Sequence, residues 1–212
     1  MRFFDFGRRR RPIAETAALA DFIDEQSAFI VQKGIFEYSR ARAGHYAKIL
    51  FAEASFLEML DRARWRAFPL GLAMVGEVTE GVLNPFLHEV GGPDSRLGGL
   101  SRLKPIVLSV FDRYAQPASL DPVSWSAARE KLARDLDLIG THPPKMAKDI
   151  PERFAAAYTE LMPIHKNLRL NEGPTIRNYL KVTLCNIHDE LSGRLDGRAV
   201  AAELLARPVE AN

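Results

Sequence analysis

The chain has 212 residues, 47% hydrophobic and 26% charged, a balance typical of a globular protein that excludes wholesale disorder and a membrane-embedded bundle. Its formal net charge is +2, but five arginines and one aspartate lie in residues 1–12, so the remainder carries 24 basic and 26 acidic side chains and no broad basic surface for nucleic acid. The single cysteine, Cys185, excludes an intramolecular disulfide, and a cytoplasmic location is the expectation that follows.

Residues 1–12 are a basic N-terminal tail that we expect to be peripheral to the fold, with residues 13–212 forming a single helical domain. An arginine near an anionic lipid surface contributes about 1 kcal/mol, and phenylalanine can add shallow insertion. The tail therefore predicts peripheral membrane contact, and a tail without a lipid partner is the open alternative. The side chains concerned are Phe3, Phe4, Arg8, Arg9, Arg10 and Arg11.

Apolar residues recur at steps of three and four over residues 14–33, which predicts a helix. Residues 35–64 continue the pattern and contain no proline. One long helix over both ranges and two helices with a break near Gly34 or Gly44 therefore both remain open.

Pro69 and Gly71 predict a junction before the next helix. Later, Asp121 before Pro122 is a helix opening in which the aspartate caps and the proline occupies the first turn. No segment shows strand-like alternation over a useful length. We therefore predict an all-α fold, a single-domain bundle of about seven helices without a β-sheet. After the junction, the expected helices cover residues 72–88, 97–114, 121–139, 149–162, 174–191 and 198–206.

Two charged residues fall on an otherwise apolar helical face in the first half of the chain. On an unbroken helix, that face would contain Val31, Ile35, Tyr38, Arg42, Tyr46, Ile49, Glu53, Phe56 and Leu60. Arg42 and Glu53 would lie roughly 16 Å apart along the axis, so they cannot neutralise each other. Each needs another partner, and the helix bearing Glu77 and Glu80 is one source.

This face gives the main candidate site. In one interpretation, Arg42 and Glu53 form cross-helix ion pairs. In the other, Arg42 holds an anionic small molecule in an inter-helix pocket, with Tyr38 and Tyr46 as its walls.

A row of polar residues on the 72–88 helix is the weaker candidate for a metal site. Glu77, Glu80 and Asn84 are spaced to lie on one helix side, and His88 extends the row. Carboxylate and imidazole ligation is conceivable there, and a solvated polar face explains the same row. No cofactor is indicated elsewhere in the sequence.

The sequence offers little support for nucleophilic catalysis. The Gly-x-Ser-x-Gly pattern of serine hydrolases is absent. Ser101 and Lys104 match a Ser-x-x-Lys spacing, but an exposed serine and lysine on a helix explain it. Cys185 and His188 can be neighbours on a helix, although a lone cysteine on a mixed face is usually inert packing.

The stretches FEYSRARAGHYAKILF and VTLCNIHDEL resemble segments of an uncharacterised bacterial family of all-helical proteins, some of which are loosely labelled esterase. The resemblance implies an all-helical fold over most of the chain. It names no catalytic residue, so we carry over no activity from it.

These observations predict a non-catalytic helical protein that binds a partner or a small anionic ligand in an inter-helix pocket. The alternative is an enzyme of unrecognised type, either a hydrolase or metal-dependent. A homodimer is also predicted, because the long segment from Gly34 to Arg64 and the aromatic junction at Trp65 and Phe68 need more cover than a small domain gives.

Overall fold

The computed structural model describes residues 11–92, 95–163 and 171–206, without the side chains of residues 95 and 96. Of the six residues predicted to contact a membrane, only Arg11 lies inside these ranges. Its backbone carbonyl accepts a hydrogen bond from the Arg194 Nε at 3.2 Å. The described residues form no strand, so the all-α prediction is confirmed. An isolated bridge joins Ile13 to Leu195.

The helices of the first half are α1 (Thr16–Val31), the π-helical segment η1 (Gln32–Glu37), α2 (Tyr38–Ala43), the 3-10 turn η2 (Gly44–Tyr46), α3 (Ala47–Leu50) and α4 (Ala54–Gly91). Those of the second half are α5 (Ser95–Ser101), α6 (Leu103–Phe111), α7 (Pro122–Leu136), the 3-10 turn η3 (Ile150–Arg153), α8 (Ala155–Leu161), α10 (Gly173–Arg194) and α11 (Gly197–Ala206). Within the described ranges, no helix has both the length and the apolar composition required to cross a bilayer.

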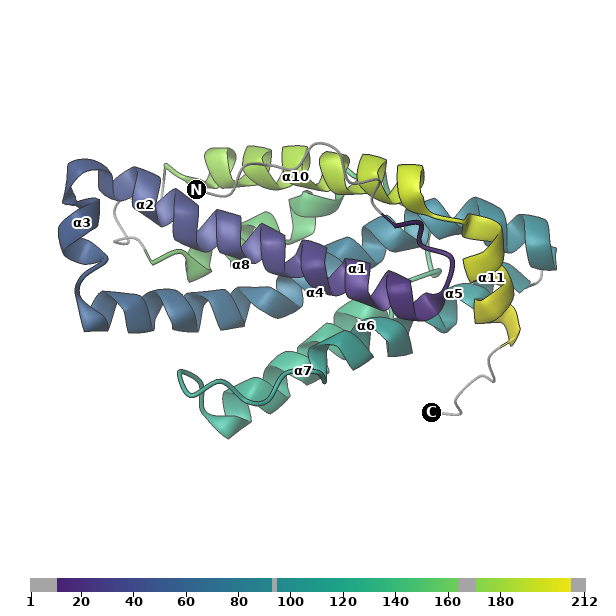
Figure 1. Ribbon diagram of the computed structural model, residues 1–212, viewed down its shortest axis with the longest axis horizontal. Coiled ribbons are helices and arrows are strands. Elements are labelled where there is room, and N and C mark those ends of the chain that lie inside the picture. Colours follow the sequence, from purple (N-terminus) through teal and green to yellow (C-terminus); the bar gives the residue numbers. More distant parts are fainter. Residues whose placement is uncertain (1–10, 93–94, 164–170, 207–212) are drawn as a thin grey trace.

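The long helix α4 is the centre of the bundle, and α1, α5, α6, α7, α8, α10 and α11 all pack against it (Figure 1). Its 38 residues span about 57 Å at the usual helical rise. Every residue from Ala67 to Glu80 is buried, because helices cover this stretch on all sides. One continuous apolar core results.

The predicted junction at Pro69 and Gly71 is wrong, because both residues lie inside α4. A proline in a helix interior removes one backbone hydrogen bond and costs about 3 kcal/mol. Here the packing around α4 offsets that cost, and Gly71 contributes directly to this packing. A Cβ at Gly71 would lie 3.1 Å from the Ser27 carbonyl oxygen, so the glycine lets α1 approach α4 closely.

The chain turns back between α2 and α4, and residues 35–64 are not one helix. Gly44 has φ 54°, a left-handed conformation that ends α2. The short helices η2 and α3 follow, and Glu53 has extended backbone before α4 starts at Ala54. We call residues 38–52 the α2–α3 corner. It lies at one end of the elongated molecule, and α5 and α11 lie at the other (Figure 1).

Other features of the helices were predicted correctly from short sequence patterns. The Asp121 side chain accepts a hydrogen bond from the Ser124 backbone N–H at 2.8 Å, so the predicted cap of α7 is present. The predicted apolar stripe of α10 is buried along its whole length. Its members are Ile176, Leu180, Leu184, Ile187 and Leu191.

Candidate functional site

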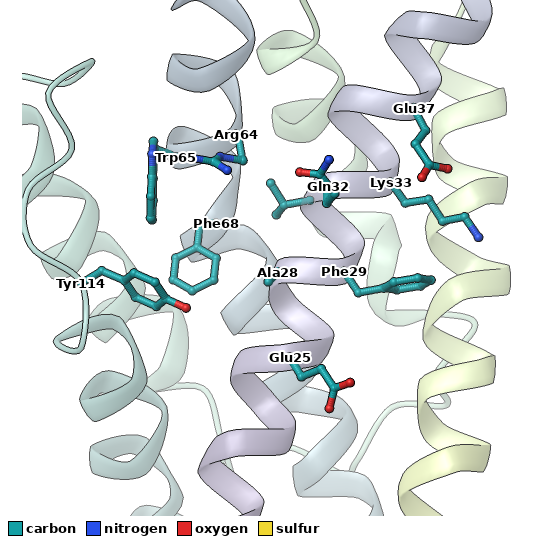
Figure 2. A pocket seen from close by; sticks show the side chains of 11 residues that line it. Glu25, Ala28, Phe29, Gln32, Lys33, Glu37, Arg64, Trp65, Phe68 and Tyr114 are labelled. Atoms are coloured by element: carbon teal, nitrogen blue, oxygen red, sulfur yellow. The ribbon is translucent and has the colours of Figure 1, made fainter. Parts of the chain in front are cut away.

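An open cleft of about 420 Å³ lies between the outer face of α1 and η1 and the first half of α4. We call it the aromatic cleft. Figure 2 shows α1 crossing in front of α4, with Trp65, Phe68 and Tyr114 to one side of α1. The lining residues are Glu25, Ala28, Phe29, Val31, Gln32, Lys33, Glu37, Arg64, Trp65, Phe68 and Tyr114.

Three aromatic side chains form one wall of the cleft, which we call the aromatic wall. Trp65 and Phe68 are one turn apart on α4, and Tyr114 follows the end of α6. Their rings meet edge to face, with centroid distances of 6.0 Å for Trp65 and Phe68, 5.4 Å for Trp65 and Tyr114, and 5.1 Å for Phe68 and Tyr114. Behind them, Trp125 lies 5.9 Å from Trp65 and stacks on Phe111. These contacts hold the wall in one arrangement.

Tyr114 is fixed in the wall by its hydroxyl, which donates a hydrogen bond to the Asp24 Oδ1 at 2.7 Å. Burial, and then this bond to the Asp24 carboxylate, raise the pKa of Tyr114 from 10.0 to about 12. Arg113 pairs with the other oxygen of Asp24 at 3.2 Å and with Asp21 at 2.8 Å. The phenol is therefore neutral at physiological pH and offers the cleft its ring rather than a free hydroxyl.

Arg64 supplies the positive charge next to the aromatic wall. Its guanidinium lies 4.9 Å from the Trp65 ring centroid, and its Nη2 donates to the Asp61 Oδ1 at 2.7 Å. Asp61 also accepts a hydrogen bond from the Ser119 hydroxyl at 2.6 Å, which holds the carboxylate in place. The Arg64 side chain is 42% exposed, although its Nε is buried and has no hydrogen-bond partner among the described residues. Spare donor capacity therefore remains on this guanidinium.

The opposite wall is the exposed face of α1 and η1. Ala28 and Gln32 lie toward the aromatic wall, whereas Phe29 and Lys33 project to the other side of α1 (Figure 2). The Lys33 ammonium lies 5.1 Å from the centroid of the Phe29 ring, and that ring is 45% exposed. The cleft thus continues from an aromatic interior to a rim that is charged and partly apolar.

The π-helical segment follows α1 where the end of α1 contacts the buried Tyr158 and the partly buried Tyr179. The hydroxyls of Tyr158 and Tyr179 each donate a hydrogen bond to the Ile30 carbonyl at 3.0 Å. Gly34 lies against the Tyr158 hydroxyl and the Tyr179 ring, and a Cβ there would overlap the Tyr158 oxygen and lie 2.9 Å from the Tyr179 Cε1. Single π-helical turns occur often at functional sites, and this one carries Gln32 and Lys33 into the cleft.

A second, wider groove of about 1000 Å³ runs between α4, α7 and α8. Its lining contains no aromatic side chain among the described residues. Lys131 pairs with Asp135 at 2.7 Å and Arg62 with Glu58 at 2.8 Å, so much of its charge is used within the protein. The aromatic cleft is the better defined binding site because its wall is apolar and its polar groups are few.

Of the residues predicted for an anion site, the structure brings Tyr38 and Arg42 together around a buried carboxylate. The Tyr38 hydroxyl donates to Glu172, and the Arg42 Nη2 lies 2.5 Å from the Glu172 Oε1. Glu172 is only 6% exposed and immediately precedes α10. Arg42 therefore has a cross-helix partner, and that partner is not on the helix of Glu77 and Glu80.

Tyr46 and Glu53 lie away from this pair, and the predicted nine-residue face is wrong. The α-helix ends at Ala43, so the 3.6-residue period does not carry through the α2–α3 corner. Tyr46 is 58% exposed and packs against the His45 ring, and Glu53 is exposed before α4. None of the four predicted ligand residues lines the aromatic cleft.

The row on α4 is neither a solvated face nor a cluster of metal ligands. Glu77 is buried and accepts a hydrogen bond from Arg153 of η3, and Glu80 is buried and accepts one from the Gly140 backbone N–H at 2.8 Å. His88 is exposed. The described residues contain no group of three His, Cys, Asp or Glu side chains that could hold a metal ion. The two glutamates instead fasten the chain between α7 and α8 to α4.

The two candidates for nucleophilic catalysis have other contacts. The Ser101 hydroxyl donates to the Gly98 carbonyl at 2.9 Å, and Lys104 pairs with Asp137. The His188 Nδ1 lies 3.2 Å from the Asp189 Oδ1, on the exposed part of α10.

Sequence reasoning identified Trp65 and Phe68 only as an aromatic junction that needed cover. Tyr114 and Arg64 were missed, because no local pattern indicates that the end of α6 meets the first half of α4.

Comparison of the chain with protein-family models, curated proteins and solved structures gave no match. The resemblance to the bacterial all-helical family thus stays a prediction, and function has to be inferred from the site.

Proposed function

We propose that the protein binds a small amphipathic ligand, with a planar apolar body and an acidic group, in the aromatic cleft. The observation that carries the proposal is a fixed aromatic wall with a half-exposed arginine beside it. A cleft of about 420 Å³ lies within the size range of pockets for small organic ligands. The proposal keeps the predicted class of ligand and moves its site from Arg42 to Arg64.

The aromatic wall would take the ligand body. Ring–ring contacts with Trp65, Phe68 and Tyr114 favour a planar partner, and edge and face contacts each add to the burial of apolar surface. Because the three rings already contact one another, little side-chain freedom is lost on binding.

Arg64 would take the acidic group. Its guanidinium lies 4.9 Å from the centroid of the Trp65 ring, and Asp61 holds it through one hydrogen bond. Glu25 and Glu37 also line the cleft, but they project from the far side of α1 in Figure 2. A carboxylate or sulfonate placed over the wall would therefore meet a cation before it meets either glutamate.

Isothermal titration calorimetry with two matched probes tests this proposal. 8-Anilinonaphthalene-1-sulfonate is an aromatic anion, and N-phenyl-1-naphthylamine is its uncharged counterpart. We expect the anion to bind with one-to-one stoichiometry and Arg64→Gln to weaken it by roughly 10- to 100-fold, the range for a hydrogen bond to a charged group. The same variant should leave binding of the uncharged probe nearly unchanged.

Trp65→Leu should weaken both probes, because both use the aromatic wall. Arg62→Gln is the control for charge on the same helix, since Arg62 lines the wider groove and pairs with Glu58. Equal loss of sulfonate binding in Arg62→Gln and Arg64→Gln, or normal binding in Trp65→Leu, would contradict the proposed site.

A further inference from the structure

The α2–α3 corner carries basic side chains and no acidic ones. Residues 38–52 contain Arg40, Arg42 and Lys48 and no aspartate or glutamate. Arg42 is partly neutralised by Glu172, whereas Arg40 and Lys48 are exposed and have no acidic partner among the described residues. The corner is therefore a positively charged surface at one end of the molecule (Figure 1).

Two large apolar side chains accompany these charges. Tyr46 is 58% exposed and Ile49 is 60% exposed, three residues apart on η2 and α3. The core contacts of the corner are made by other side chains: Phe51 packs edge to face on Phe36 at 5.1 Å and on Phe56 at 5.3 Å. Neither Tyr46 nor Ile49 belongs to the core that the described residues form.

We propose that the α2–α3 corner is a contact for an anionic lipid surface. Tyrosine favours the level of the lipid headgroups, an isoleucine can enter the boundary of the acyl chains, and lysine and arginine attract anionic headgroups. The corner has all three kinds of side chain within one turn of the chain.

The shape of the corner favours a lipid surface over a protein partner. A stable protein interface buries about 800 Å² on each side, whereas the large exposed apolar side chains of the corner are two, Tyr46 and Ile49. Shallow insertion into a membrane needs only a few apolar side chains with cations around them. This contact is independent of the aromatic cleft and of the predicted role of the N-terminal tail.

Co-sedimentation of the full chain with lipid vesicles tests the proposal. We expect binding to vesicles of phosphatidylglycerol and phosphatidylcholine and none to phosphatidylcholine alone. A contribution of about 1 kcal/mol per cation corresponds to about a fivefold change in partitioning, so the double variant Arg40→Gln and Lys48→Gln should bind roughly 25-fold more weakly. Tyr46→Ser with Ile49→Ser should also weaken binding, and these exposed positions leave the fold intact.

A matched control combines Val123→Ser, at a side chain that is 78% exposed on α7, with Lys148→Gln, at an exposed lysine. This control should bind like the parent. A third variant replaces Arg8, Arg9, Arg10 and Arg11 with glutamine in the full chain. The proposal is overturned if the parent does not bind anionic vesicles. It is also overturned if the corner variants bind as strongly as the parent while the tail variant binds more weakly.

Discussion

Replacing Gly34 with alanine is expected to destabilise the protein, although alanine is ordinarily the better helix former by about 1 kcal/mol. Gly34 lies in η1, where the added Cβ would overlap the Tyr158 hydroxyl and lie 2.9 Å from the Tyr179 Cε1. Overfilling a packed core costs about 1–3 kcal/mol, and Tyr158 has no room to withdraw because it is fully buried. Less the helix-propensity gain, the net effect should be a loss of up to about 2 kcal/mol in the free energy of unfolding.

Gly193→Ala is the matched control, because Gly193 is exposed in α10 and a Cβ there meets nothing within 4 Å. It should stabilise the protein slightly. Urea unfolding followed by circular dichroism at 222 nm measures both variants. Tyr158→Phe removes the nearest atom, so the double variant Gly34→Ala with Tyr158→Phe should lose less stability than the two single losses added together. The reasoning is refuted if Gly34→Ala is as stable as the parent, or if the two losses simply add.

Three further predictions concern other parts of the fold. Glu77→Gln should cost about 2 kcal/mol in urea unfolding, because it leaves Arg153 mostly buried without its carboxylate, and unchanged stability would show that the pair is dispensable. Asp121→Ala should lower the urea midpoint by removing the acceptor for the Ser124 N–H, whereas Asp121→Asn, which keeps a capping oxygen, should retain it. The pKa of Tyr114, raised from 10.0 to about 12 by burial and Asp24, gives stability that is complete below pH 10 and is lost as pH rises through 12. Tyr114→Phe should therefore lose less stability than the parent over that interval, and equal losses would contradict the assignment.

The elements that the sequence predicts well are those determined by neighbours in the chain. Asp121 before Pro122 needs only local geometry to start α7, and the stripe of α10 needs only the helical period. Pro69 violates a local rule, and only the burial of α4 on all sides explains why the helix continues there. A helix end at Gly44 could be predicted only as an alternative to a continuous helix, because glycine permits a left-handed conformation without requiring it.

The candidate site depends on contacts between distant segments, which a single sequence does not contain. The need of Arg42 for a partner could be inferred from its position among apolar residues, but Glu172 precedes a helix far along the chain. The spacing of Trp65 and Phe68 is visible in the sequence. That Tyr114 completes their wall is a consequence of how α6 packs beside α4 and α1.

The indole N–H signal of Trp65 gives the most direct test that the aromatic cleft is a binding site. The chain has two tryptophans, so a Trp125→Phe variant labelled with ¹⁵N-tryptophan shows Trp65 alone in a proton–nitrogen correlation spectrum. Addition of 8-anilinonaphthalene-1-sulfonate should move this signal progressively and stop at one equivalent, because the probe's rings would lie against the Trp65 ring. The account is contradicted if calorimetry records binding of the sulfonate to the same variant while the Trp65 signal does not move.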